Sequence, residues 1–167
     1  EGEPMKGAVA VADLMTGMYS AVAILAALHH RDRTGEGQHI DMALLDTQVA
    51  WLGNQAQAYL TSGTAPPRLG NAHATVVPYQ VFPSADGHIV LAIGNDGQFQ
   101  RFGAAAGAAG LAADARFATN TARVINRAAL VPEVARLVAQ RKSADWIASL
   151  EKANVPCSPS NRLDQVF

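Results

Sequence analysis

Asp13 is the side chain best placed for covalent chemistry. It stands at the start of an apolar run with helical spacing, where an N-cap residue belongs. Backbone N–H groups and the positive end of a helix dipole favour an ionised carboxylate there. Such a carboxylate can attack an acyl carbonyl and form a covalent intermediate if the site also stabilises the oxyanion. Asp is equally a common structural cap, so residue type alone leaves both interpretations open.

A short polar loop from Arg68 to His73 is the second candidate. Gly70 would let the backbone approach a ligand closely, and Asn71 and His73 could supply side-chain hydrogen bonds. The same residues would also suit an ordinary turn between domains. The loop is therefore either a substrate-binding element or a connection.

Metal and nucleotide sites are not indicated. The histidines share no recognised ligand spacing with each other or with Cys157, the single cysteine. Gly35-Glu36-Gly37 lacks the third glycine of a dinucleotide fingerprint and does not open a helix. We expect neither a metal nor a bound cofactor.

The composition describes an ordinary globular protein. The 167 residues are 49% hydrophobic, and the formal net charge of -1 gives no electrostatic reason to expect nucleic acid or an anionic membrane as a partner. A single cysteine fits a reducing cytoplasm or an organelle matrix without choosing between them. The alanine-rich composition without a targeting segment favours a bacterial cytoplasm, or a mitochondrial matrix if the protein is eukaryotic. Glu1-Gly2-Glu3-Pro4 is neither a start region nor a targeting segment, which indicates a piece of a longer chain.

The elements before the loop are predicted to be mostly helical. Helical spacing over about residues 13–30 predicts a helix buried on most sides in a soluble protein. A surface turn follows, then a short strand over residues 38–45 and a second helix over about 46–60. Turn formers at residues 61–67 mark a domain boundary, which gives predicted domains of 1–65 and 66–167.

The second part is predicted to be α+β. Two β-rich runs, residues 76–82 and 88–93, are joined by Asp86-Gly87, a pair that favours a tight hairpin turn between antiparallel strands. Gly94-Asn95 marks a possible helix start. The predicted helices span about residues 96–106, 127–140 and 143–153, the last capped by Ser143, and Pro156 and Pro159 then impose an extended ending.

Taken together, these motifs resemble the central block of the class III CoA-transferase family, also called the carnitine dehydratase and bile-acid-inducible protein F family. The likeness covers nearly the whole chain. The matching segments are Ala12-Asp13-Leu14-Met15-Thr16-Gly17-Met18-Tyr19, Ile24-Leu25-Ala26-Ala27-Leu28, Thr34-Gly35-Glu36-Gly37-Gln38-His39-Ile40-Asp41, Gly70-Asn71-Ala72-His73, Val77-Pro78-Tyr79-Gln80-Val81-Phe82, Asp86-Gly87, Gly94-Asn95 with Gln98-Phe99, Phe117, Asn120, Arg123, Asn126-Arg127, and Val155-Pro156-Cys157-Ser158-Pro159 with Asn161.

The resemblance implies that Asp13 is the catalytic aspartate, in an Asp-x-x-Thr-Gly context. In the family mechanism the aspartate forms a mixed anhydride with the acyl group and then an aspartyl-CoA thioester. A glycine-rich loop that covers the aspartate in formyl-CoA transferase aligns with residues 70–73, but Asn71, Ala72 and His73 replace its extra glycines. That departure argues against formyl and oxalyl substrates.

The likeness is greatest to transferases that use succinyl-CoA and a dicarboxylic acid. It implies that Arg68 or His73 meets the distal carboxylate of the acid, with coenzyme A thioesters as substrates and no other cofactor. It also implies an α/β fold: an interlocked, ring-like homodimer with a large Rossmann-like domain, of which residues 1–65 are a segment, and a small α+β domain at 66–167. The 167 residues alone would not catalyse transfer.

Two other readings stay open. An α-methylacyl-CoA racemase shares the family fold and uses an aspartate and a histidine to move a proton at the acyl α-carbon. Racemases tend to carry glycines where this sequence has Thr16-Gly17-Met18, which favours a transferase. The other reading is a non-catalytic interaction or binding module, for which Asp13 would be dispensable.

Overall fold

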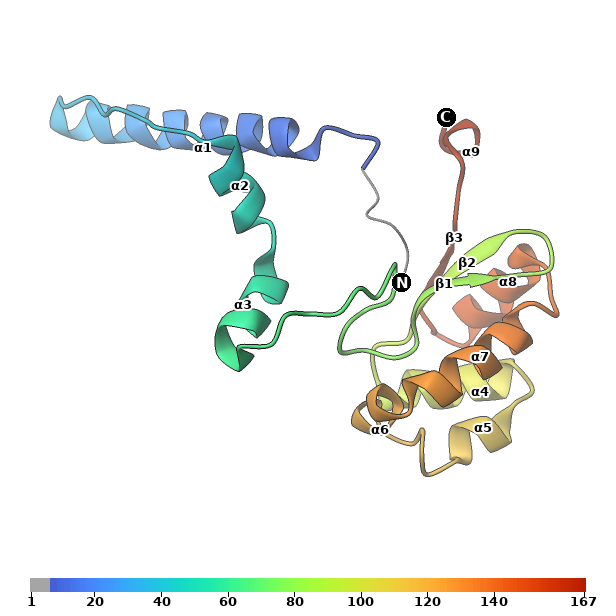
Figure 1. Cartoon of the computed structure of the whole chain (residues 1–167). Helices are drawn as coiled ribbons and strands as arrows, with labels where there is room; N and C mark the ends of the chain where they lie inside the picture. The colour runs from blue at the N-terminus through green and yellow to red at the C-terminus, as the bar shows by residue number, and fades with distance from the viewer. Residues whose placement is uncertain (1–6) are drawn as a thin grey trace. The chain divides into compact units, whose positions relative to one another are not determined.

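The computed structural model describes residues 7–167 and divides into two compact units (Figure 1). The first unit ends at Arg68, and the second runs from Leu69 to Phe167, a division close to the predicted boundary between residues 65 and 66. Residues 1–4, which indicated a piece of a longer chain, lie outside the described residues.

The described part of the first unit consists of helices and irregular chain. Its helices are α1 (Val11–Thr34), α2 (Leu44–Ala50) and α3 (Gly53–Ser62). The first helix ends at Gly35, whose left-handed conformation, with φ 78°, lets its N–H donate to the Arg31 carbonyl oxygen at 2.7 Å. The hydroxyl oxygens of Thr16 and Thr47, 2.6 Å apart, join α1 to α2.

Three predictions for this unit are wrong. Residues 38–45 form no strand: irregular chain leads directly to α2 at Leu44, because the alternation of polar and apolar residues is short and no described strand of the unit lies beside it. The single helix expected over 46–60 is two helices, separated at Trp51 and Leu52 ahead of Gly53, whose φ is 48°. Asp13 is not the N-cap, because the helix begins two residues earlier and Ala10 holds that place.

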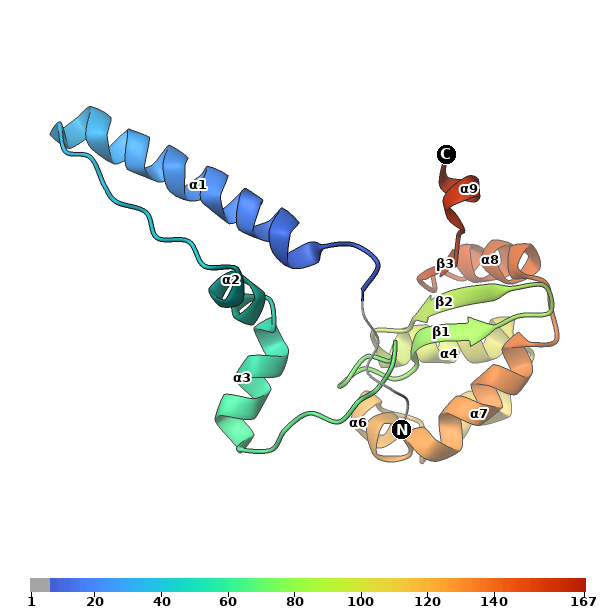
Figure 2. The ribbon, with the colours of Figure 1, turned by 45° about the horizontal axis from the view of Figure 1, so that its top comes forward.

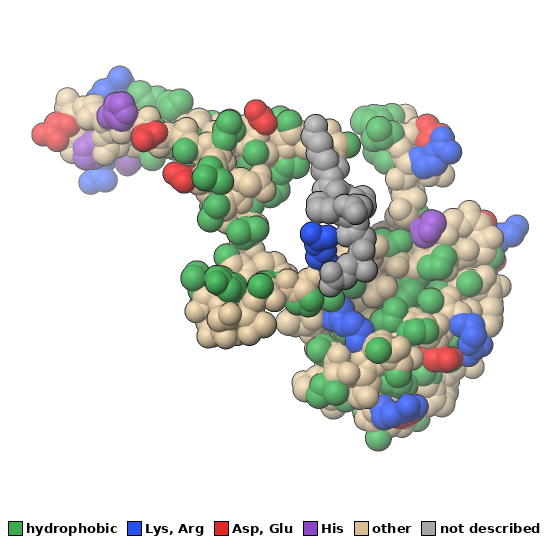
Figure 3. Space-filling view, in the orientation of Figure 1, with side chains coloured by type: hydrophobic (Ala, Val, Ile, Leu, Met, Phe, Trp, Pro, Cys, Tyr) green, Lys and Arg blue, Asp and Glu red, His purple; other side chains and the backbone are tan. Residues whose placement is uncertain are grey.

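The burial expected for the first helix is also absent from this chain. No residue of α1 is buried, because among the described residues α2 is the element that packs on it. Figure 3 shows hydrophobic side chains, in green, along the surface of α1, α2 and α3. Large apolar side chains that lie exposed on these helices are Leu14, Met18, Tyr19, Val22, Ile24, Leu25, Leu28, Leu44, Leu45, Val49, Tyr59 and Leu60.

The length and apolar composition of α1 would also suffice for a membrane span, the one such case among the described helices. Core helices of soluble proteins and signal sequences meet the same criterion. The hydroxyls of Thr16 and Ser20 donate to carbonyl oxygens of their own helix, and Thr16 also meets α2. The contact of Thr16 with Thr47 of α2 fits a helix packed against other elements, and a core helix stays our prediction for α1.

The second unit is built on a three-stranded antiparallel sheet. Its strands are β1 (Tyr79–Pro83), β2 (His88–Ala92) and β3 (Cys157–Pro159), in the order β1-β2-β3. The predicted hairpin is confirmed, with Phe82 opposite Ile89 and a turn in which the Ser84 N–H donates to the Gly87 carbonyl at 2.9 Å. The predicted extended ending forms β3, which adds to the sheet beside β2.

Six helices follow β2 in the described chain. The helices expected over 96–106, 127–140 and 143–153 are confirmed as α4, α7 and α8, and three shorter helices were not predicted. Ser143 is not a cap: it is the first residue of α8, and its own N–H donates to Asp86 Oδ1 at 2.8 Å. The helices are α4 (Asp96–Ala105), α5 (Ala109–Ala113), α6 (Asn120–Ile125), α7 (Arg127–Val138), α8 (Ser143–Lys152) and α9 (Leu163–Val166).

A single hydrophobic core holds the second unit together. Alternate residues of the strands, Phe82, Ile89 and Leu91, turn to a face of the sheet around which α4, α7 and α8 gather (Figure 2). On the helices, the ring of Phe102 stacks with that of Trp146, with centroids 6.2 Å apart. Every buried apolar side chain of the described residues belongs to this unit.

Candidate active site

Asp13 lies in the first turn of α1 with its side chain exposed. Among residues 7–167, no hydrogen bond or ion pair reaches this carboxylate. Both of its oxygens are therefore free to meet a substrate, which a carboxylate engaged as a structural cap would not be.

The loop at residues 70–73 is fastened to β1 of the second unit. Gly70 has φ 60°, and a Cβ at this position would meet no atom within 4 Å. The Ala72 N–H donates to the Leu69 carbonyl at 3.0 Å, and Asn71 Oδ1 accepts from the Val81 N–H at 2.9 Å. Asn71 thus orients the loop with its oxygen, and its NH2 group makes no hydrogen bond to the described residues.

His73 is held on three sides. Its N–H donates to the Tyr79 carbonyl at 2.8 Å, and its ring stacks on the Tyr79 ring with centroids 5.2 Å apart. Its Nδ1 accepts from the Thr75 N–H at 3.2 Å. Because a neutral imidazole carries one proton, this bond assigns the proton to Nε2. Nε2–H, which donates to no group in the described chain, is the donor that His73 can offer to an anion.

The predicted site residues are divided between the two units. Gly70, Asn71 and His73 share one loop of the second unit. Asp13 and Arg68 belong to the first unit, where Arg68 is its exposed last residue.

A buried arginine that carried no predicted role supports the chain just after this loop. Arg123, on α6, is fully buried and donates to the carbonyl oxygens of Val77 at 2.7 Å and Phe117 at 3.0 Å. Its third contact is an ion pair with Asp96 Oδ1 at 2.9 Å, and its guanidinium lies 4.6 Å from the centre of the Phe99 ring. The sequence showed the arginine but not its burial, because its partners come from distant segments.

Other candidate nucleophiles and ligands are weaker. Burial, and to a smaller extent the Glu151 carboxylate, raises the pKa of the Cys157 thiol, so it stays protonated at neutral pH and is a poor nucleophile. Within the described part of the chain, no group of three or more His, Cys, Asp and Glu side chains is placed to hold a metal ion.

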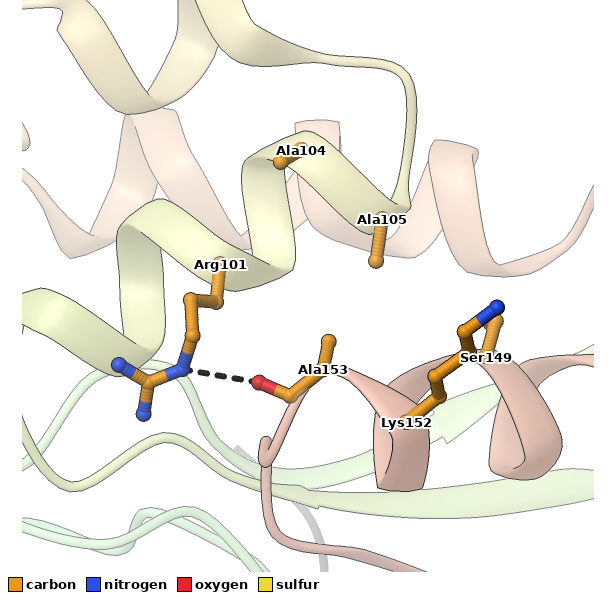
Figure 4. A pocket seen from close by; sticks show the side chains of 6 residues that line it. All are labelled: Arg101, Ala104, Ala105, Ser149, Lys152 and Ala153. Carbon is orange, nitrogen blue, oxygen red and sulfur yellow. Dashed lines mark hydrogen bonds between the residues drawn. The ribbon is translucent and has the colours of Figure 1, made fainter.

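A surface hollow of about 410 Å³ between α4 and α8 carries two cationic side chains, Arg101 and Lys152 (Figure 4). Arg101 is engaged as a helix cap: its guanidinium donates to the carbonyl oxygens of Ala153 at 2.8 Å and Asn154 at 3.1 Å. The C-terminal ends of α4 and α8 border the hollow, and their dipoles oppose a bound anion. We therefore do not regard this hollow as a candidate substrate site.

Comparison with known proteins finds similarity over the whole length of the chain. The model of CoA-transferase family III matches residues 1–167. A succinate–glutarate CoA-transferase of Agrobacterium fabrum is 48% identical over 167 residues, which are 100% of this chain and 42% of the relative. A succinyl-CoA:glutarate CoA-transferase of Mus musculus is 38% identical over 167 residues, 100% of this chain and 38% of the relative.

Solved structures agree. A CAIB/BAIF family protein from Brucella suis is 50% identical with a TM-score of 0.82, and the match covers 100% of this chain and 44% of that one. A hypothetical protein from Mycobacterium tuberculosis is 28% identical with a TM-score of 0.84, over 99% of this chain and 43% of that one. The mixed helical fold with a small sheet is thus shared with part of such proteins, and the chain spans less than half the length of these relatives.

Proposed function

This chain belongs to CoA-transferase family III, and we propose that the protein transfers coenzyme A from succinyl-CoA to a dicarboxylic acid through a covalent intermediate on Asp13. The exposed carboxylate of Asp13, unpaired within residues 7–167 at the start of α1, is the observation that carries the proposal. The names of the Agrobacterium and mouse relatives support the choice of succinyl-CoA and a dicarboxylate.

The chemistry proceeds in two symmetrical halves. A carboxylate oxygen of Asp13 attacks the thioester carbonyl, the C–S bond breaks, and coenzyme A leaves as a thiolate with an Asp13–acyl anhydride behind it. The thiolate attacks the aspartyl carbonyl, which releases the donor acid as a carboxylate and leaves an aspartyl-CoA thioester. The acceptor carboxylate then attacks that thioester, and the returning thiolate attacks the acceptor acyl carbonyl. Asp13 is regenerated as a carboxylate, with no oxidant or net proton consumed.

We assign recognition of the second carboxylate of the acid to the Nε2–H of His73, with Arg68 supplying a cation. The Nε2–H of His73 is a directional donor whose tautomer is set by the Thr75 N–H. A hydrogen bond to an ionised carboxylate is stronger than one between neutral groups, so such a donor distinguishes a dicarboxylic from a monocarboxylic acid.

We propose the same assembly for the intact protein as the family resemblance implies: a large Rossmann-like domain that includes the first unit, and an interlocked homodimer. The exposed apolar side chains of α1, α2 and α3 support it, because helices with such faces are stable when other elements cover them.

Trapping the intermediate tests the proposal. The intact protein is incubated with succinyl-CoA and then with hydroxylamine, and its peptides are analysed by mass spectrometry. Hydroxylamine converts an aspartyl thioester to a hydroxamate, so we expect a modified peptide that maps to Asp13. Asp13→Asn should lose both the adduct and transfer by a factor of at least about 10³, because the nucleophile is gone.

The matched control is Asp32→Asn, which removes a second exposed aspartate of α1, paired with Arg31 at 3.2 Å. This variant should keep the adduct and the activity. An adduct on another residue, or full transfer by Asp13→Asn, would contradict the proposal. Deuterium exchange at the substrate α-carbon without acyl exchange would instead support the racemase.

A further inference from the structure

The segment at residues 73–77, which includes His73 and Thr75, is irregular chain between the loop and β1. Irregular backbone holds a side chain in one orientation only where its own polar groups are bonded to rigid elements. In this segment three side chains from α6 and α7 supply those bonds. They are Asn120, Arg123 and Arg127.

Arg127, at the start of α7, holds the first part of the segment. Its Nη2 donates to the carbonyl oxygens of His73 at 2.8 Å and Ala74 at 2.7 Å. A half-buried guanidinium that bonds two successive carbonyls fixes the orientation of the peptide planes between them, and with them the direction of the His73 side chain.

Asn120, at the start of α6, holds the rest of the segment with both ends of its amide. Its Nδ2 donates to the Thr75 carbonyl at 2.8 Å, and its Oδ1 accepts from the Val77 N–H at 3.2 Å. Arg123 adds the bond to the Val77 carbonyl and is itself held by the Asp96 carboxylate.

We propose that Asn120, Arg123 and Arg127 are positioning residues that hold residues 73–77 so that the Thr75 N–H meets His73 Nδ1 and His73 donates from Nε2 to an acid substrate. The expected effect on transfer kinetics rests on the function proposed above, whereas the effect on the conformation of residues 73–77 does not. Each of the three residues bonds a different part of this segment: Arg127 at residues 73 and 74, Asn120 at residues 75 and 77, and Arg123 at residue 77.

Hydrogen exchange of the intact protein, followed by mass spectrometry, tests the structural part. Arg127→Ala and Asn120→Ala should each speed exchange of the amides in residues 73–77 by about tenfold, because their bonded N–H groups would open more often. Exchange in β2 and α8 should stay unchanged. Arg123 is not the residue to replace, because removing a buried, hydrogen-bonded cation can unfold the whole unit.

The control is Arg136→Ala, which removes an exposed arginine of α7 paired with Glu133 at 2.8 Å. It should leave exchange at 73–77 as in the wild type. Unchanged exchange in Arg127→Ala and Asn120→Ala, or the same increase in Arg136→Ala, would overturn the proposal.

Transfer kinetics test the consequence for His73. Arg127→Ala should raise KM for glutarate about tenfold, with little change in kcat or in KM for butyrate, because one charge-assisted hydrogen bond to the second carboxylate is misdirected. Arg127→Lys, which keeps a cation able to donate to both carbonyls, should recover most of the loss. An equal rise in KM for both acids, or a loss in kcat alone, would overturn this part.

Failure of the proposed function is recognised separately. If wild-type protein transfers no coenzyme A, the state of His73 is read from the side-chain spectrum of ¹⁵N-histidine-labelled protein, assigned with His73→Gln. The proposal then requires an Nε2-protonated imidazole in wild type and a mixture of tautomers in Arg127→Ala. The same mixture in both proteins would overturn it.

Discussion

The two units differ in how completely they bury their own apolar side chains. In the second unit, strands and helices enclose a core in which Phe102, Trp146 and Leu130 have essentially no exposed surface. In the described part of the first unit no apolar side chain is buried, although α1 is the longest helix described. The second unit therefore carries its own stability, whereas the first depends on contacts with something outside the described residues.

Unfolding the two units as separate pieces tests this difference in stability most directly. Residues 69–167 alone should unfold in one cooperative transition, whereas residues 1–68 alone should show a gradual loss of helical signal, because an amphipathic helix without a covered face is marginal in water. Circular dichroism and calorimetry of the two pieces provide the measurement. A cooperative transition in residues 1–68, or none in residues 69–167, would contradict the comparison.

The next largest difference between the units should appear in the free energy of unfolding when one large side chain of each unit is truncated. In the 167-residue chain, Phe102→Ala should lower the free energy of unfolding of the second unit by about 3–5 kcal/mol, because the cavity would lie in a closed core. Urea unfolding followed by Trp146 fluorescence in a Trp51→Phe background measures this change. Leu25→Ala on α1, where the side chain is 66% exposed, should change the free energy of unfolding of the first unit by less than about 0.5 kcal/mol, which Trp51 fluorescence in the chain with Trp146 retained and the helical circular dichroism signal report.

Two glycines of the second unit, one closely packed and one not, test how tightly its helices pack. A Cβ on Gly103 would lie 2.6 Å from the Ala112 Cβ, so Gly103→Ala should destabilise the unit by about 1–3 kcal/mol. Gly110→Ala, on α5, meets nothing within 4 Å and should stabilise by about 0.5 kcal/mol, since alanine is the better helix former. Thermal unfolding of the two variants tests the difference, and a neutral Gly103→Ala would show a looser α4–α5 contact.

The smallest expected effect is a pH dependence confined to the second unit. The Ser143 N–H, with smaller contributions from the Ser143 and Ser84 hydroxyls, lowers the pKa of Asp86 below its ordinary 3.8. The stabilisation that this carboxylate gives is therefore present above pH 3.8 and lost as the pH falls through the lowered pKa. Asp86→Asn should remove that part of the acid sensitivity in urea unfolding. A variant with the full acid sensitivity of the wild type would contradict this.

Prediction from sequence succeeded where the structure is local. The hairpin followed from two β-rich runs around Asp86-Gly87, and α4 from the start at Asn95, whose side chain accepts from the Gln98 N–H at 2.9 Å. It failed for residues 38–45, where a short alternation had no neighbouring strand to pair with. It also failed for the cap of α8, because the Ser143 N–H is bonded by a residue from the distant hairpin turn.

For the candidate site, the sequence pointed to Asp13 and to the loop through His73, and their roles stay predictions. It gave no indication that Asn71 bonds β1, or that Thr75 sets the tautomer of His73. Nothing in the spacing of Asn120 and Arg127 indicated that they hold the same segment, because their partners lie far away in the chain.

By itself the sequence determined the order of most elements, because glycine turns and apolar periodicity are properties of short stretches of chain, and its motifs carried the resemblance to the family that the comparisons confirm. Only the tertiary structure decided what was buried and which polar groups met: Arg123 in the core, Asn120 and Arg127 on the segment of His73, and α1 with its apolar side chains uncovered. Burial and hydrogen bonding between distant segments depend on the packing of whole elements, which no local pattern encodes.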